Sequence, residues 1–244
     1  MTTAFLALWN DYPVALAEEY EAWHTFEHVP ERLTSPGILS ARRYASKGDG
    51  EVDRYFTLYE LDDLDALQHP DYLDLVRNPT PWSAKMRANF SNVLRIPGDC
   101  IASGGRGTGA FACVQAFSVG RSHASAACLQ MALLLQDRVS CGQALSYRIG
   151  LAEPNQRYEV FEQVLQTEAD RLIVVVLVES SSPGGLAQLQ STMTAAAQDV
   201  LRPAESLREG PFRLLVSFTA GEAPSNRSDI LAGEMLRSQF DSNR

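Results

Sequence analysis

The first hundred residues alternate between short apolar runs and longer stretches with helical spacing, a pattern that predicts strands and helices in turn. Strands are expected at residues 3–9, 38–45, 54–61 and within 91–96. Helices are expected at residues 16–33 and 64–77. Pro36 and Gly37 follow the first helix, Pro70 breaks the second, and residues 79–82 are expected to be irregular. The order β-α-β-β-α-β predicts a ferredoxin-like unit.

The same pattern begins again after a stretch rich in Gly and Ser, residues 97–109, which is expected to be a linker. Residues 2–8 match residues 108–114, and residues 31–42 match residues 137–148 in the same register. The repeat predicts two tandem ferredoxin-like units. The domains are expected at residues 1–98 and 108–220, with a polar C-terminal tail at 221–244.

The later elements of the second copy occur in the same order as in the first copy, but they lie further along the chain than the offset of the earlier matches predicts. Strands are expected at residues 172–179 and 212–218, a helix at 186–190, and a short amphipathic helix within 230–240. The changed spacing predicts an insertion in the second copy near residues 153–166.

The chain of 244 residues has a net charge of −9 and a pI near 5.0. This balance argues against a nucleic-acid-binding protein, which usually presents a basic face. The longest apolar run, residues 172–178, is too short to span a bilayer. The four cysteines are widely spaced without a C-x-x-C pair, which indicates reduced thiols. These features predict a cytoplasmic protein that binds a small-molecule substrate and neither nucleic acid nor membranes.

Two of the four histidines, His24 and His28, lie one helical turn apart, with Glu27 between them and Glu31 beyond. Groups that exchange protons near pH 7 are concentrated in this segment. At the positions equivalent to Trp23, His24, Glu27 and His28, the second copy carries Leu129, Gln130, Leu133 and Leu134. The chemistry is therefore expected in the first copy, with the second copy as a scaffold.

The segment from Trp23 to Leu33, followed by Pro36-Gly37 and by Ala41-Arg42-Arg43-Tyr44, resembles the helix–strand signature of the EthD-like dimeric α+β barrel proteins. The resemblance implies an α+β fold in which two ferredoxin-like sheets pack face to face into a barrel, here within one chain. It matches His28 to the family's helix histidine, whereas His24 stands where other members often carry Tyr. Family activities include cofactor-free decarboxylation, cyclisation, isomerisation and oxygenation, as well as haem chemistry. Pairing of two such chains into a homodimer is compatible with the resemblance.

The first functional hypothesis is a cofactor-independent lyase or isomerase acting on a small aromatic or polyketide-like acid or ketone. His28 is the expected general base or acid, since an apolar barrel interior would shift its pKa and exclude bulk water. The other residues expected to act in catalysis are His24, Arg42, Tyr44 and Tyr59. The residues expected to bind the substrate are Trp9, Trp23, Tyr55, Arg43 and Trp82. Strand alternation sends Arg42 and Arg43 to opposite faces, and Arg32 is expected to pair with a helix Glu.

Two alternatives stay open. In one, the chain is a non-catalytic small-molecule-binding barrel whose histidines hydrogen-bond to the backbone or to helix neighbours. In the other, His24 or His28 binds a metal or haem, because the pentad from His24 to His28 spells H-x-x-E-H. A catalytic zinc needs a third protein ligand, for which His69 and Asp71 are the candidates. The first hypothesis requires neither a metal nor a cofactor.

Overall fold

The computed structural model describes residues 3–48, 52–154, 160–161, 170–201, 204–230 and 234–241. The strands are β1 (Ala4–Pro13), β2 (Ile38–Lys47), β3 (Val52–Leu61), β4 (Ser91–Gly105), β5 (Phe111–Gly120), β6 (Ser146–Ala152), β7 (Arg171–Ser180) and β8 (Ala204–Thr219). The helices are α1 (Ala17–Trp23), α2 (Val29–Leu33), α3 (Pro70–Arg77), α4 (Pro81–Arg87), α5 (Arg121–Ser140), α6 (Pro183–Val200) and α7 (Glu234–Asp241). Short helical segments are η1 (Val14–Leu16), η2 (His24–His28), η3 (Leu64–Gln68), η4 (Ala220–Glu222) and η5 (Arg227–Ile230).

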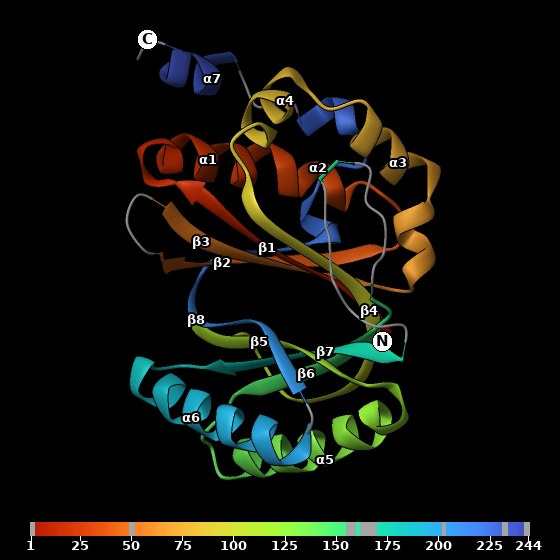
Figure 1. Ribbon diagram of the computed structural model, residues 1–244. Helices are drawn as coiled ribbons and strands as arrows, with labels where there is room; N and C mark the ends of the chain where they lie inside the picture. Colours follow the sequence, from red (N-terminus) through yellow and green to blue (C-terminus); the bar gives the residue numbers. More distant parts are fainter. Residues whose placement is uncertain are drawn as a thin grey trace.

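The strands form one closed barrel in the order β1-β3-β2-β8-β5-β7-β6-β4, and neighbouring strands are antiparallel. The first sheet has the order β4-β1-β3-β2, and the second repeats it as β8-β5-β7-β6. β2 pairs with β8 and β4 pairs with β6, so the two sheets close on each other. The predicted fold, two ferredoxin-like units packed as a barrel within one chain, is confirmed (Figure 1).

Helices cover the outer face of each sheet, and the inner faces form the barrel interior (Figure 1). α1 to α4 lie over the first sheet, and α5 and α6 lie over the second. Side chains along β1 alternate between the faces, so Phe5 and Trp9 pack in the interior core while Leu6 packs under the helices. The same alternation decides which polar residues of the first sheet meet the helix layer.

A buried ionic network inside the barrel joins the two halves. The carboxylate of Glu179, at 0% exposure, accepts hydrogen bonds from Arg42 (2.8 Å), Tyr44 (2.8 Å) and Ser146 (2.7 Å). Arg42 also pairs with Glu60 at 2.8 Å, and Glu60 pairs with Arg148 at 2.5 Å. Burial raises the pKa of Glu60, but the charges of Arg148 and Arg42 outweigh burial and hold this pKa below its usual value.

The predicted linker is wrong, because residues 97–105 continue β4. The strand pairs with β1 as far as Asp99 and with β6 from Asp99 to Gly105. Gly105 has a φ of +82°, and an added Cβ would collide with the backbone of Leu145, so the glycine serves close strand pairing. The domain boundaries proposed from the sequence stay a prediction, since β4 itself pairs with both sheets.

The expectation of irregular structure at residues 79–82 is wrong in part, because α4 begins at Pro81. Pro81 suits the first turn of a helix, where its missing N–H has no partner to lose. The side chain of Thr80 accepts a hydrogen bond from the backbone N–H of Ser83 at 3.0 Å and caps the helix. The sequence signal was therefore present as Thr80 followed by Pro81, an N-cap residue and a first-turn proline.

The C-terminal segment is polar, as its sequence shows, and it packs on the helix layer of the first half. Arg227 pairs with Glu31 at 2.6 Å and with Asp74 at 3.0 Å. Arg237 on α7 pairs with Glu27 at 2.8 Å, and α7 lies beside α4 (Figure 1). Two carboxylates of the histidine-bearing helix are thus neutralised by arginines from the end of the chain.

Of the insertion expected at residues 153–166, only 153–154 and 160–161 fall within the described residues. Phe161 packs against Phe90 of the first half, with ring centroids 5.2 Å apart. In the described part of the chain, no helix combines the length and the hydropathy that crossing a membrane requires.

Replacing Glu179 with Gln should destabilise the protein, because Arg42 would lose the charge of one of its two carboxylate partners. Removing one partner of a buried ion pair typically lowers the free energy of unfolding by about 3 kcal/mol or more. Urea denaturation followed by circular dichroism measures this loss. The matched control is Glu205→Gln at an exposed position of β8, which should change stability by less than about 0.5 kcal/mol. Equal stability of the two variants would contradict the role of the network.

Candidate functional site

The two histidines lie on η2, a π-helix turn within the helical segment predicted from the sequence. The backbone N–H of Val29 donates to the carbonyl of His24, five residues earlier, instead of to the carbonyl four residues earlier. Pro30 accounts for the wider turn, because it lacks an N–H and its ring would collide with the carbonyl of Phe26 in a regular α-helix. π-helix turns are frequent at functional sites.

The imidazole rings of His24 and His28 lie side by side among aromatic rings. Their centroids are 4.9 Å apart, and the indole of Trp23 packs against His28 at 4.4 Å. Tyr20 meets His24 edge-on at 5.5 Å. His24 is buried, at 2% exposure, whereas His28 is half-buried. His28 is therefore the more accessible of the two bases.

A small cavity of about 30 Å³ separates this turn from the outer face of the first sheet. It is lined by Leu8, Trp23, His24, His28, Arg32, Thr57, Tyr59, Arg87, Phe90 and Phe161. The expectation that the barrel interior encloses His28 is wrong, because the cavity lies between sheet and helices. Along β3, Thr57 and Tyr59 face the helix layer, while Phe56 and Leu58 alternate with them and pack in the interior core.

Several buried polar atoms around this cavity have no hydrogen-bond partner in the described part of the chain. They are Nδ1 of His24, Nδ1 of His28, Nη1 of Arg32 and Oγ1 of Thr57. Buried polar groups are nearly always paired, and each unpaired group costs about 1–3 kcal/mol of stability. Their concentration around one cavity indicates a site for a polar ligand or ordered water.

Arg43 adds a buried positive charge next to the cavity. It lies opposite Thr57 in the ladder between β2 and β3 and is 1% exposed. Its guanidinium lies over the rings of Tyr20, at 5.1 Å, and Tyr55, at 5.6 Å. Its three nitrogens have no hydrogen-bond partner among the described residues. A cation–π contact contributes about 0.5–2 kcal/mol but leaves the N–H donors of the guanidinium unsatisfied.

The surroundings hold both imidazoles in the neutral form. Burial, followed by the charge of Arg43, lowers the pKa of His24 well below the ordinary value of 6.5. Burial, followed by the charge of Arg32, lowers the pKa of His28 in the same way. A neutral imidazole keeps one nitrogen free of a proton, so each ring can act as a base. Burial raises the pKa of Tyr59, so its phenol stays protonated.

The carboxylates next to the histidines are engaged outside the cavity. Glu27 accepts hydrogen bonds from the hydroxyl of Thr80 and from the guanidinium of Arg237. Glu31 accepts a hydrogen bond from Arg227 at 2.6 Å. The glutamate of the H-x-x-E-H pentad is therefore committed to α4 and α7 rather than to its neighbouring histidines.

The residues expected to supply a third metal ligand serve a helix terminus instead. His69 precedes α3, and its Nδ1 accepts a hydrogen bond from the backbone N–H of Asp71 at 3.3 Å. Among the residues that the structure describes, no three His, Cys, Asp or Glu side chains are grouped to hold a metal ion.

The structure brings together part of the set predicted from the sequence. Trp23, His24, His28 and Tyr59 line the cavity. Arg43 lies directly behind them over the rings of Tyr20 and Tyr55.

The remaining predicted residues lie elsewhere. Arg42 and Tyr44 face the barrel interior and bind Glu179. Trp9 also faces the interior, where its ring packs on Phe56 at 4.7 Å. Trp82 belongs to the helix layer and donates its Nε1–H to Glu19 at 3.0 Å.

Sequence reasoning missed Arg32 and Thr57 as site residues. The expected ion pair between Arg32 and a helix Glu is wrong, because Glu31 is paired elsewhere and Arg32 lies over the ring of Tyr72 at 5.5 Å. Thr57 could have been found from the alternation of the third strand, which places it on the same face as Tyr59.

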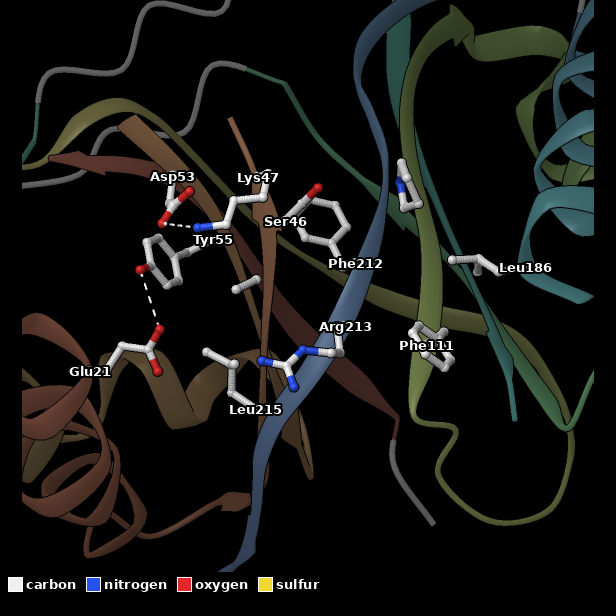
Figure 2. A pocket seen from close by; sticks show the side chains of 12 residues that line it. Glu21, Ser46, Lys47, Asp53, Tyr55, Phe111, Leu186, Phe212, Arg213 and Leu215 are labelled. Carbon is white, nitrogen blue, oxygen red and sulfur yellow. Dashed lines mark hydrogen bonds and ion pairs between the residues drawn. The ribbon is translucent and has the colours of Figure 1, made fainter. Parts of the chain in front are cut away.

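A larger cleft of about 340 Å³ lies at the seam between the two halves (Figure 2). It is lined by Glu21, Ala45, Ser46, Lys47, Asp53, Tyr55, Phe111, Leu186, Pro211, Phe212, Arg213 and Leu215. Polar side chains in this cleft pair with each other: Lys47 with Asp53 at 3.3 Å and Tyr55 with Glu21 at 3.4 Å. Within the described residues, the cleft lacks the buried unpaired atoms that mark the histidine cavity.

Stability should fall as the pH falls below about 6.5, because the unfolded chain protonates His24 and His28 there while the folded protein keeps them neutral. In the variant carrying both His24→Gln and His28→Gln, this part of the pH dependence should disappear. Urea titrations from pH 8 to pH 5 measure the free energy of unfolding of both proteins, with His123→Gln on α5 as the control. Parallel curves for the wild type and the double variant would contradict the buried neutral pair.

No protein-family model and no curated protein matches this sequence. Solved structures that match most of the chain at TM-scores above 0.5 include three proteins. An anthrone oxidase-like protein has a TM-score of 0.60 and 10% identity, covering 91% of this chain and 95% of that one. A monooxygenase-like protein from Fusobacterium nucleatum has a TM-score of 0.52 and 9% identity, covering 89% and 95%. A monooxygenase-like protein from Lactobacillus acidophilus has a TM-score of 0.51 and 8% identity, covering 89% and 97%.

Identities this low show the fold alone, and the narrower resemblance to EthD-like proteins stays a prediction. The fold itself rests on the closed barrel and on these matches together. The fold is therefore that of a dimeric α+β barrel, with both halves of the barrel supplied by one polypeptide.

Proposed function

We propose that this chain is an enzyme that transfers a proton on a small aromatic or polyketide-like acid or ketone, with His28 as the base. The observation that carries the proposal is the pair of adjacent imidazoles beside a cavity flanked by cations, each with a buried Nδ1 that has no hydrogen-bond partner among the described residues. Burial lowers the pKa of both rings, which favours their neutral form. A general base must be unprotonated at the working pH and shielded from bulk water. The surroundings of His28 favour both.

The two histidines have different parts in this proposal. His28 is half-buried and borders the cavity, so it meets the substrate, whereas His24 is more deeply buried. With the ring centroids 4.9 Å apart, a proton on one imidazole disfavours a proton on the other. The pair therefore carries a single proton during turnover, with His24 positioning His28.

The surrounding residues stabilise the negative charge that proton removal creates. When His28 takes a proton from a carbon next to a carbonyl, the C–H electron pair moves to the carbonyl oxygen as an enolate. The charges of Arg32 and Arg43 favour this oxygen, and the protonated phenol of Tyr59 can donate a hydrogen bond to it. Returning the proton from His28 to a different atom of the same substrate completes an isomerisation.

A lyase reaction uses the same groups. In a decarboxylation, His28 takes the proton of the carboxylic acid, and the electrons of the breaking C–C bond move to the carbonyl oxygen as CO₂ leaves. His28 then passes its proton to the carbon. Neither reaction requires a cofactor or a co-substrate.

Oxygenation without a cofactor is a second candidate, favoured by the names of the similar structures, which are anthrone oxidase-like and monooxygenase-like. Its first step is the same removal of a proton by His28. The resulting carbanion would then be oxidised by O₂, the oxidant that this reaction consumes. Dependence of turnover on O₂ separates this candidate from the lyase or isomerase.

Substrate binding requires the cavity to widen. A volume of about 30 Å³ exceeds the roughly 10–15 Å³ that one water needs, but it is too small for an aromatic ring. Phe90 and Phe161 pack on each other at the cavity. Displacing these two rings would make room next to Trp23 and His28.

The alternatives use the same residues for other purposes. A binding barrel would hold the ligand without needing His28 to change its protonation state. A metal- or haem-binding protein would use Nδ1 of His24 or His28 as a ligand atom. Metal analysis and a visible absorption spectrum of the purified protein test the metal- or haem-binding alternative without the need for a substrate.

Replacing His28 with Gln should lower kcat by about 10²–10⁴-fold, the usual contribution of a general base, with a smaller effect on KM. A substrate is first identified by NMR, as an aromatic ketone or acid into which the protein introduces deuterium from D₂O, in air and under nitrogen. His24→Gln should slow turnover less than His28→Gln, and the exposed His123→Gln on α5 should leave it unchanged. Full activity of His28→Gln on that substrate would contradict the proposal.

A further inference from the structure

We infer that the histidine cavity takes a ligand with a negatively charged oxygen, a carboxylate or an enolate. Arg32 binds this oxygen by direct contact, and the positive charge of Arg43 adds to the attraction. The inference rests on the proposed function, because it names the substrate class of the same site. It is carried by buried positive charge that no carboxylate of the described residues neutralises.

Arg32 is the residue that would touch the ligand. It lines the cavity and is 4% exposed, and its buried Nη1 has no hydrogen-bond partner in the part of the chain that the structure describes. Its observed contact is the ring of Tyr72, with the guanidinium carbon 5.5 Å from the centroid. An aromatic face attracts the cation but accepts no strong hydrogen bond from Nη1.

Arg43 reinforces the same charge from behind. All three of its side-chain nitrogens are buried without a hydrogen-bond partner in the described residues, and its contacts are the rings of Tyr20 and Tyr55. It lies opposite Thr57 in the strand ladder, and Thr57 contributes an unpaired hydroxyl to the cavity. Two buried guanidiniums therefore act on one small volume.

The two carboxylates that flank His28 along the helical segment form ion pairs with other residues. Glu31, next to Arg32 in the chain, pairs with Arg227 at 2.6 Å. Glu27 pairs with Arg237 at 2.8 Å. Both partners come from the C-terminal segment, so this segment keeps the helix carboxylates from compensating Arg32.

A bound anion would neutralise part of the buried positive charge of Arg32 and Arg43. An uncompensated buried charge costs several kcal/mol, and charge-assisted hydrogen bonds between a guanidinium and an oxyanion are among the strong ones in proteins. One ligand oxygen would accept hydrogen bonds from Nη1 of Arg32 and from the hydroxyl of Thr57. The apolar part of the ligand would lie against Trp23 and Phe90.

The experiment compares benzoate with benzamide, which has nearly the same shape without the charge. Isothermal calorimetry at constant ionic strength, checked by Trp fluorescence, gives both dissociation constants for wild type. Benzoate should bind at least tenfold more tightly than benzamide. Arg32→Gln should remove this preference, Arg32→Lys should retain part of it, and Arg213→Gln in the seam cleft should leave it unchanged.

The inference is overturned if wild type binds benzamide as tightly as benzoate, or binds neither. It is also overturned if a folded Arg32→Gln keeps the wild-type preference. His28→Gln separates this inference from the proposed function, because it should keep the preference for benzoate while losing turnover. Loss of turnover in His28→Gln without any preference for benzoate in wild type would leave the proposed function standing and the anion site refuted.

Discussion

Closure of the eight-strand barrel is the constraint on which the rest of this structure depends. Because β2 pairs with β8 and β4 with β6, every side chain of the first sheet must face either the interior or the helix layer. Arg42 and Arg43, adjacent in sequence, consequently have opposite environments. Arg42 is bound by two carboxylates inside the barrel, whereas Arg43 lies among tyrosines on the outer face, with no hydrogen bond to a carboxylate of the described residues.

This separation divides the polar residues by function. The interior network of Glu179, Glu60 and Arg42 is hydrogen-bonded on both sides of the barrel, which suits a structural role. The outer cavity has the opposite character, since its imidazoles, Arg32 and Thr57 carry buried unpaired atoms. Unsatisfied groups that the fold maintains at one place are the expected mark of a ligand site.

Much of the fold could be predicted from alternation, helix spacing and the internal repeat, and the opposite orientation of Arg42 and Arg43 followed from the strand period. The sequence could not show which of these two arginines faces the helices, because that depends on how the two sheets close into the barrel. The π-helix turn was also not predicted from the sequence, although Pro30 within a helical run was a local signal for it. The partners of Glu27 and Glu31, Arg237 and Arg227, lie about two hundred residues away in the chain. No local pattern could therefore show that Arg32 has no ion pair with a carboxylate of the described residues.

The proposed chemistry depends on one property of the site, the neutral state of the two imidazoles that the π-helix turn holds among buried cations. Its most direct test is an NMR titration of the imidazole nitrogens of His24 and His28, assigned through the single His→Gln variants. Because burial lowers the pKa of both rings, we expect both to be still neutral at pH 6.5, the ordinary pKa of histidine. Half-protonation of either ring at pH 6.5 or above would contradict it, because the pair would then be neither desolvated nor under the charges of Arg32 and Arg43.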